Sequence, residues 1–258
     1  AVDADGYLYI VGGGASSAIS VTRSMNAQIP GAVIEWDDPV YVDLGGNLSG
    51  WQDINPEGLL GQVNMDIDRS GGPGHGNIYV LASVVPLSGP DVADISFVKS
   101  TDGGLTWSDP IWVNDEKNDG NTHWFGTMSV APNGRIDVIW LDTRDGGGVD
   151  YSALYYSYSV DQGDTWSANM KLSESFDPHV GYPSQNKMGD YFDMTSDDQG
   201  AHLAWANTLN GEEDVYYSRI FLSEAAIVNI DNNIINSIAI TPNPGSGIYQ
   251  ISGVEDAN

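Results

Sequence analysis

The sequence contains no cysteine, which excludes disulfide bonds, thiolate chemistry and cysteine-ligated zinc. Basic residues are scarce as well: nine lysines and arginines stand against 36 aspartates and glutamates, so the formal net charge is −27. A chain of this charge is repelled by polyanions, and neither nucleic acid nor an anionic membrane is expected as a partner. No apolar run has the length that a bilayer requires, so membrane insertion is not expected.

The chain is rich in turn-forming sequence instead. Its 31 glycines and 12 prolines in 258 residues favour short strands joined by many turns. Residues 100–110 (STDGGLTWSDP) and 159–169 (SVDQGDTWSAN) both read Ser-x-Asp-x-Gly-x-Thr-Trp. Each element of the motif recurs after 59 residues, which indicates a structural repeat. The aspartate suits acceptance of turn amides, the glycine gives backbone freedom, and the tryptophan leads into a strand.

This motif resembles the Asp-box, or bacterial-neuraminidase repeat, of the sialidase-like β-propellers. The resemblance implies an all-β fold of four-stranded antiparallel blades. It also implies that the box closes the hairpin between the third and fourth strands of a blade, on the face opposite the active site. A structural role is therefore expected for the motif residues, which are Ser100, Asp102, Gly104, Trp107, Ser159, Asp161, Gly163 and Trp166.

Four copies of one unit can be aligned outward from these motifs. One strand of each reads GYLYIVG from Gly6, GNIYVLAS from Gly76, GRIDVIWLD from Gly134 and GAHLAWAN from Gly200. Alternation with β-branched and aromatic residues is the strand signal, and repeats of this length built from four strands predict a propeller. The inner strand of the first unit is reduced to AVDAD. We therefore expect four blades of a six-bladed ring cut at its N-terminal side, with a closed four-bladed ring as the alternative.

The sequence divides into three parts. Residues 1–222 are predicted to form the propeller, residues 223–236 its last strand and a linker, and residues 237–258 a separate C-terminal segment. The pattern from Pro242 to Tyr249 resembles the opening of the C-terminal sorting domain of the type IX secretion pathway, in a shortened form. The resemblance implies export by the type IX machinery to a secreted or cell-surface location; the alternative is an ordinary turn between two strands.

Antiparallel order places the Asp-box turns at one rim, called the bottom, and the loops joining successive blades at the other, called the top. The resemblance makes the top the functional face. Carboxylates, aromatic rings and an arginine there suit a sugar, because rings stack on its apolar face and polar groups bind its hydroxyls. Solvated loop residues are the alternative. We predict catalytic roles for Asp142, Asp190 and Tyr191 and substrate binding by His123, Trp124, Arg144, Tyr182 and Lys187, with Glu212, Glu213 and Asp214 also at this rim.

Sialidase chemistry, as the resemblance implies it, needs three arginines to bind the substrate carboxylate. This chain has five arginines, and only Arg144 is expected at the top. We therefore expect an exported propeller that acts on or binds extracellular glycans or glycoproteins, in the catalytic version as an exo-glycosidase. The alternative is a non-catalytic adhesion or scaffold propeller that binds carbohydrate or protein.

No cofactor or metal site is predicted. Residues 66–72 (DIDRSGG) begin like a calcium-binding loop, but Asn77 occupies the position where such a loop needs a glutamate. A turn is the favoured interpretation, and calcium stays open for an acidic exported protein. The four histidines share no spacing typical of metal ligands.

Overall fold

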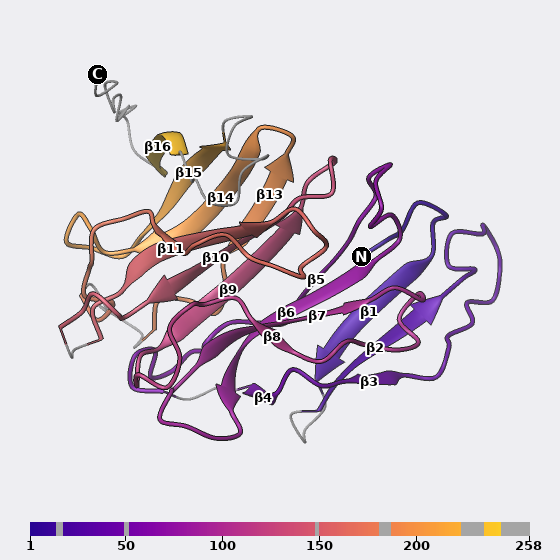
Figure 1. The fold of residues 1–258 in the computed structure, drawn as a ribbon, viewed down its shortest axis with the longest axis horizontal. Helices are drawn as coiled ribbons and strands as arrows, with labels where there is room; N and C mark the ends of the chain where they lie inside the picture. Colours follow the sequence, from indigo (N-terminus) through magenta and orange to yellow (C-terminus); the bar gives the residue numbers. More distant parts are fainter. Residues whose placement is uncertain (14–17, 49–51, 148–149, 181–186, 223–234, 244–258) are drawn as a thin grey trace.

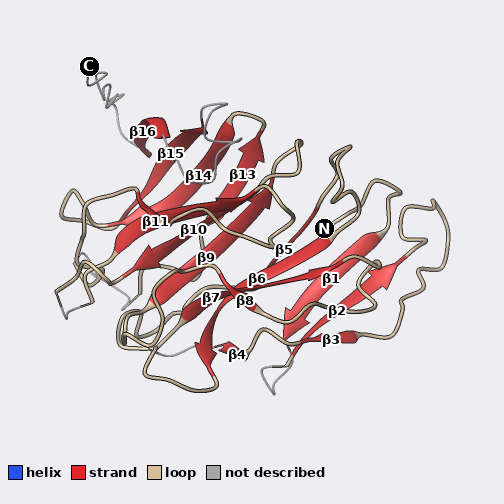
Figure 2. Cartoon of the chain, viewed as in Figure 1, coloured by secondary structure: helices blue, strands red, loops and turns tan. Residues whose placement is uncertain are grey.

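The structure, a computed structural model, describes residues 1–13, 18–48, 52–147, 150–180, 187–222 and 235–243. Within these ranges the chain is all-β, with strands and loops and no helix (Figure 2). Four antiparallel sheets lie side by side like the blades of a fan (Figure 1). This arrangement confirms the predicted propeller-type fold of antiparallel blades.

The blades follow one another along the chain. Blade one contains β1 (Leu8–Gly13), β2 (Ile19–Ser24) and β3 (Val40–Val42). Blade two contains β4 (Gly46–Leu48), β5 (Asn64–Ile67), β6 (Ile78–Pro86), β7 (Asp94–Ser100) and β8 (Ile111–Trp112). Blade three contains β9 (His123–Val130), β10 (Ile136–Asp142), β11 (Ala153–Ser159) and β12 (Met170–Lys171). Blade four contains β13 (Asp193–Asp197), β14 (Gly200–Asn207), β15 (Asp214–Leu222) and β16 (Ile235–Asn243).

Two strands differ from the sequence-based expectation. β4 lies in the stretch expected to be a loop between blades one and two, where it pairs with the end of β6. β16 pairs with β15 along almost its whole length, so the predicted boundary between residues 236 and 237 falls inside a strand of blade four. The rest of the predicted C-terminal segment, residues 244–258, and most of the predicted linker lie outside the described residues.

The two middle blades are buried on both faces, which explains their nearly continuous apolar strands. In β6, Ile78 and Val80 join the core between blades one and two, whereas Tyr79 and Leu81 join the core between blades two and three. Successive side chains of a strand point to opposite faces, so one apolar strand serves two cores. Each fully buried side chain of this size contributes about 1.5–3 kcal/mol, and these layers hold the blades together.

The two Ser-x-Asp-x-Gly-x-Thr-Trp motifs form equivalent turns, between β7 and β8 and between β11 and β12. In the second copy Ser159 Oγ donates to Asp161 Oδ1 at 2.8 Å and accepts from the Gly163 amide at 2.9 Å. The Thr165 amide and hydroxyl both donate to Asp161, at 2.9 and 2.6 Å. Ser100, Asp102, Gly104 and Thr106 repeat the same bonds at closely similar distances.

These turns are fixed by charge and by packing. Burial alone would raise the pKa of Asp161, but the hydrogen bonds from Thr165 and Ser159 outweigh it and lower that pKa. Gly163 has a φ of 82°, and a Cβ there would overlap the ring of Phe97. The Trp166 ring packs edge-on against Phe97, with ring centroids 5.1 Å apart, and Trp107 packs against the core between blades one and two. The motif therefore seals the bottom of a blade.

Candidate functional site

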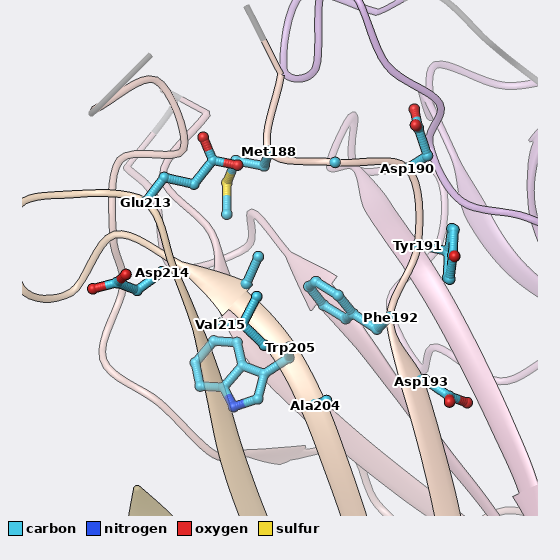
Figure 3. Close-up of a pocket in the computed structure, with 12 residues that line it drawn as sticks. Met188, Asp190, Tyr191, Phe192, Asp193, Ala204, Trp205, Glu213, Asp214 and Val215 are labelled. Carbon is cyan, nitrogen blue, oxygen red and sulfur yellow. The ribbon is translucent and has the colours of Figure 1, made fainter. Parts of the chain in front are cut away.

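A pocket of about 610 Å³ opens at the top of blade four (Figure 3). Three short segments form it: residues 188–193, which lead into β13; residues 204–206 at the end of β14; and residues 213–215, where β15 begins. All three lie at the top rim, because β13 and β15 begin at this rim and run toward the bottom rim, whereas the antiparallel strand β14 ends at it. The pocket therefore lies on the face that the sequence predicted to be functional.

The base of the pocket is aromatic. Phe192 and Trp205 are buried, their ring centroids are 6.5 Å apart, and their planes are nearly perpendicular. The indole Nε1 of Trp205 donates to Ser218 Oγ at 2.8 Å, which fixes the ring in the blade. An aromatic base flanked by polar groups suits a ligand with one apolar face, as a sugar ring has.

Four carboxyl groups surround this base: Asp190, Asp193, Glu213 and Asp214. In Figure 3, Asp190 and Asp193 lie on one side of the Phe192–Trp205 pair and Glu213 and Asp214 on the other. Burial raises the pKa of Glu213. No described residue forms a hydrogen bond with its carboxyl group, so nothing offsets this effect of burial.

The other carboxylates are held by neighbours. Lys187 Nζ lies 2.8 Å from Asp190 Oδ2, and the amide of Leu59 donates to Asp190 Oδ1 at 3.4 Å. Asn210 Nδ2 donates to Asp214 Oδ2 at 2.6 Å. The pocket thus offers a carboxyl group whose pKa is raised by burial and, on the other side of the aromatic pair, a carboxylate held by two donors. General acid catalysis and charge stabilisation across a glycosidic bond need this combination.

The segment between β4 and β5 supports the pocket from the side. Asn55 is fully buried, and its amide contacts the backbone of the segment that leads into β13. His179 Nε2 lies 3.0 Å from the carbonyl oxygen of Asp53 in the same region. The loop between β4 and β5 is therefore packed against the segment that leads into blade four.

The structure brings some predicted site residues to this pocket. Asp190 and Tyr191 line it, and Lys187 is attached to it through Asp190. The side chain of Tyr191 is the most open of these, since the residue is 64% exposed. Tyr182 lies outside the described residues.

Four other predicted site residues lie in the interior of blade three. Trp124 is fully buried and donates its Nε1 to Ser152 Oγ at 3.1 Å, so it belongs to the core and not to a substrate surface. His123 is fully buried as well, with Nδ1 3.1 Å from Asp94 Oδ1 and Nε2 3.3 Å from Asp142 Oδ2. The second contact is within ion-pair range but lacks hydrogen-bond geometry. Burial would lower the pKa of His123, but the Asp94 and Asp142 carboxylates outweigh it and raise that pKa.

Asp142 and Arg144 form a second interior group. Asp142 has no exposed surface and accepts hydrogen bonds from Trp140 Nε1 and from the amide and Nε of Arg144, each at 2.9 Å. The Arg144 side chain is 12% exposed, pairs with Asp115 at 2.7 Å and lies over the ring of Tyr155. Burial therefore argues against the substrate contacts expected of Asp142, Arg144, His123 and Trp124, and none of the four lines the pocket in blade four.

Each of the five arginines has an acidic partner. The pairs are Arg23–Asp37, Arg69–Asp66, Arg135–Asp137, Arg144–Asp142 and Arg219–Asp197. Among the described residues no arginine lines the pocket. The part of the chain that the structure describes therefore presents no arginine triad for a carboxylated sugar.

Several pocket residues were not singled out from the sequence. Examples are Met188 and Phe192 in the segment that leads into β13, Asp193 at the start of β13 and Trp205 near the end of β14. Trp205 could have been predicted from the sequence, because it is the last large apolar residue of an alternating strand that ends at the top rim. Asp193 had none, since an acidic residue three positions after Asp190 looks like any solvated loop residue.

Metal binding has no support among the described residues, where no cluster of three or more histidine, aspartate or glutamate side chains could hold an ion. Residues 66–72 belong to the hairpin from β5 to β6, in which Asp68 Oδ1 accepts the amide of Ser70 at 2.7 Å. Within the described ranges there is also no helix that could span a membrane.

No protein-family model and no curated protein matches the sequence. Among solved structures, the GH93 α-L-arabinofuranosidase of Fusarium graminearum, solved with arabinobiose, aligns with a TM-score of 0.56 and 14% identity over 94% of this chain. The α-L-arabinanase of Penicillium chrysogenum, also solved with arabinobiose, gives 0.57 and 15% over 97%. A Hadza microbial sialidase gives 0.43 and 15% over 88% of this chain and 44% of its own, a score from which we draw nothing.

The chain spans 64% of the length of the first of these proteins and 67% of the second. At these identities the likeness concerns the fold alone. The predicted resemblance to sialidases therefore holds in a coarser form: the chain has the β-propeller fold found in proteins that act on carbohydrates.

Proposed function

We propose that this chain is a glycan-active β-propeller and that the pocket in blade four takes a sugar unit of a neutral glycan and cleaves its glycosidic bond. The proposal rests mainly on two carboxyl groups that line the pocket on opposite sides of its aromatic base. Burial raises the pKa of Glu213, and Lys187 holds the carboxylate of Asp190 in place. Glycoside hydrolysis uses two carboxyl groups in this way, one as general acid and one as base or nucleophile.

Each residue has a role in this proposal. Glu213 donates a proton to the leaving oxygen, a role that the upward shift of its pKa by burial favours. Asp190, held by Lys187 and the Leu59 amide, is the opposing carboxylate. Tyr191 is exposed beside Asp190, on the side of its segment that points away from the Phe192–Trp205 pair, and its ring is available to a sugar unit that extends beyond this base. Phe192 and Trp205 form the apolar base.

Charge supports a neutral substrate over a sialic acid. Four acidic side chains line the pocket, and among the described residues no arginine does, so a substrate carboxylate would meet repulsion. The two solved structures with TM-scores above 0.5 named here are an arabinofuranosidase and an arabinanase, both solved with arabinobiose. A pentose-containing glycan such as arabinan is therefore the first substrate to try.

The test is hydrolysis of a panel of neutral and sialic acid-containing glycosides by the wild-type protein and by Glu213→Gln. We expect turnover of a neutral glycoside, and we expect Glu213→Gln to lower kcat by about 10²–10⁴-fold, because a positioned general acid contributes that much. Glu212→Gln is the matched control: it removes the same charge one residue away, at an exposed position outside the pocket. Equal activity in the two variants would contradict the assignment.

A second candidate is a non-catalytic glycan-binding propeller. The observation that favours it is the Lys187–Asp190 ion pair, which occupies one oxygen of the carboxylate that catalysis needs. In that case the pocket binds oligosaccharide, Glu213→Gln leaves the affinity almost unchanged, and no glycoside is hydrolysed by folded protein.

Export also belongs to the proposal. The sequence resemblance near Pro242 and the net charge of −27 support a secreted or cell-surface protein that is moved by the type IX machinery. Fractionation of the native host into cytoplasm, membranes and medium tests this, and a purely cytoplasmic protein would contradict it.

A further inference from the structure

A second pocket, of about 190 Å³, lies at the top of blade two and shares no lining residue with the pocket in blade four. It lies between the end of β6, the start of β7, the end of β8 and the loop that leaves the blade. Drug-sized ligands need about 300–1,000 Å³. The smaller pocket therefore suits a single ring-sized ligand and not an extended chain.

A buried carboxylate with spare acceptor capacity lines this pocket. The Asp94 side chain is 4% exposed, and its Oδ1 accepts from Asn114 Nδ2 at 2.8 Å and lies 3.1 Å from His123 Nδ1. Within the described part of the chain, Oδ2 accepts no hydrogen bond. Asp94 lines the pocket, and a carboxylate oxygen with free lone pairs accepts hydrogen bonds, so Oδ2 suits the hydroxyl of a ligand or an ordered water.

Two further side chains give the pocket the other groups that a sugar needs. Trp112 is partly buried in the wall, where it packs against the core between blades one and two and leaves ring surface in the pocket. Lys117 is exposed at the rim and has no ion pair among the described residues. The pocket thus combines an aromatic surface, an acceptor and a donor.

The loop wall of the pocket is fixed before any ligand arrives. Asp91 Oδ2 accepts the amide of Asn118 at 2.6 Å, and Asp91 Oδ1 accepts the amide of Gly120 at 2.9 Å. Asn118 has a φ of 57°, in the left-handed region that a non-glycine residue rarely adopts. Asparagine adopts this region more readily than other non-glycine residues, and the two hydrogen bonds to Asp91 hold the turn in place. A preformed wall of this kind loses little entropy on binding.

We propose that this pocket is a second carbohydrate subsite that holds one neutral sugar unit, with Trp112 against the ring and Asp94 Oδ2 accepting a hydroxyl. The choice of a sugar over another small polar ligand rests on the proposed function. An anionic sugar is disfavoured, because both Asp91 and Asp94 line the pocket. Such a site would anchor a glycan on blade two while the pocket in blade four acts on it.

The experiment is a titration of nitrogen-15-labelled protein with neutral pentoses, hexoses and their oligosaccharides, followed by amide chemical shifts. We expect shifts at residues 86–94 and 112–118 in the wild-type protein. Ser88→Trp fills the pocket from an exposed wall position and should weaken this binding by about tenfold or more. Thr101→Trp introduces the same side chain at the opposite rim and should leave it unchanged.

A milder variant separates a blocked pocket from a damaged fold. Lys117→Ala removes only an exposed ammonium group and should weaken binding by about two- to fivefold through one lost donor. The inference is overturned if Ser88→Trp leaves sugar binding intact. It is also overturned if the amides near Trp112 of the wild-type protein respond to no sugar, a result that would leave ordered water as the partner of Asp94. Hydrolysis assays on the same samples report separately on blade four, since Ser88→Trp leaves Glu213 and Asp190 untouched.

Discussion

The amide group of Asn55 donates a hydrogen bond from Nδ2 to the carbonyl oxygen of Gly189, 134 residues later in the chain, at 3.0 Å. The same nitrogen donates to the carbonyl oxygen of Leu59 at 2.7 Å, and Oδ1 accepts the amide of Met188 at 3.0 Å. One fully buried side chain thus joins the segment between β4 and β5 to the segment that leads into β13. Because Asp190 follows Gly189 directly, Asn55 helps to set the position of the proposed carboxylate.

We expect Asn55→Ala to lower the free energy of unfolding by about 1–3 kcal/mol, because it leaves buried backbone groups without partners. It should also lower kcat/KM, because Met188 and Asp190 lose a fixed backbone. Urea unfolding and steady-state kinetics measure the two effects. The control is Asn47→Ala, at an exposed position of β4, which should change neither. An Asn55→Ala protein with wild-type stability would contradict this role.

The carboxylates in the two Ser-x-Asp-x-Gly-x-Thr-Trp turns predict how the stability of the protein depends on acid pH. Asp161 has a lowered pKa, so its contribution is present above its ordinary value of 3.8 and is lost as the pH falls through the folded-state value. At neutral pH we expect Asp161→Ala to cost about 1–2 kcal/mol in the free energy of unfolding, through loss of the bonds to Thr165 and Ser159.

Asp109→Ala is the control for Asp161→Ala, because Asp109 is exposed and its carboxylate makes no hydrogen bond among the described residues. Urea unfolding at neutral pH and at about pH 3 compares the variants, the latter below the ordinary carboxyl pKa. The deficit of Asp161→Ala should shrink at the lower pH, because the carboxyl group of the unfolded wild-type chain then takes up a proton and part of the stabilisation from the lowered folded-state pKa is lost. A deficit that stays constant would show that the effect comes from lost packing and not from the charged hydrogen bonds.

The local part of this fold could be predicted from the sequence. The repeat of the Ser-Asp-Gly-Trp motif and the alternation in strands such as β6 and β10 depend on neighbours along the chain, which the sequence displays directly. The assignment of top and bottom rims followed from antiparallel order alone. It led to Asp190 and Tyr191, which do line the pocket in blade four.

The interior polar residues could not be predicted in the same way. Asp142 ends a strand and precedes a polar loop, so its sequence context resembles that of an exposed site residue. Its burial depends on His123, which lies opposite it in β9, and on Arg144 folding back over it. Asn55 is a stronger case, since its partners come from a blade two repeats away. Contacts of this kind are decided by how the blades pack, which no local pattern contains.

The surroundings of His123 predict that the protein loses stability as the pH rises. It lies between Asp94 of β7 and Asp142 of β10, with Arg144 paired to Asp142 and the carboxylate of Asp119 acting on it from the loop. Its folded-state pKa is raised above the ordinary 6.5. The stabilisation is therefore complete below pH 6.5 and is lost as the pH rises through the folded-state value.

We expect urea unfolding between about pH 5 and 9, a range that brackets the ordinary histidine pKa, to show wild-type stability falling with pH, and His123→Gln to flatten that slope. His75→Gln, at an exposed histidine, should keep the wild-type slope. Should His123→Gln keep it as well, the pH dependence would have to come from the general repulsion of this acidic chain, which both variants retain.

Substitution of Arg144 can distinguish a structural role of this residue from a substrate-binding role. Its guanidinium pairs with the fully buried Asp142 at 2.8 Å and with Asp115 at 2.7 Å, and no part of it lines the pocket in blade four. Arg144→Ala leaves the Asp142 carboxylate buried without its main cation, so we expect a loss of about 3 kcal/mol in the free energy of unfolding. The KM of the molecules that remain folded should stay at the wild-type value, because no substrate contact is removed.

Lys171→Ala is the control, since it breaks a half-exposed pair with Asp145 in the same blade and should cost less than about 1 kcal/mol. Wild-type stability combined with a raised KM in Arg144→Ala would instead return this arginine to the substrate site.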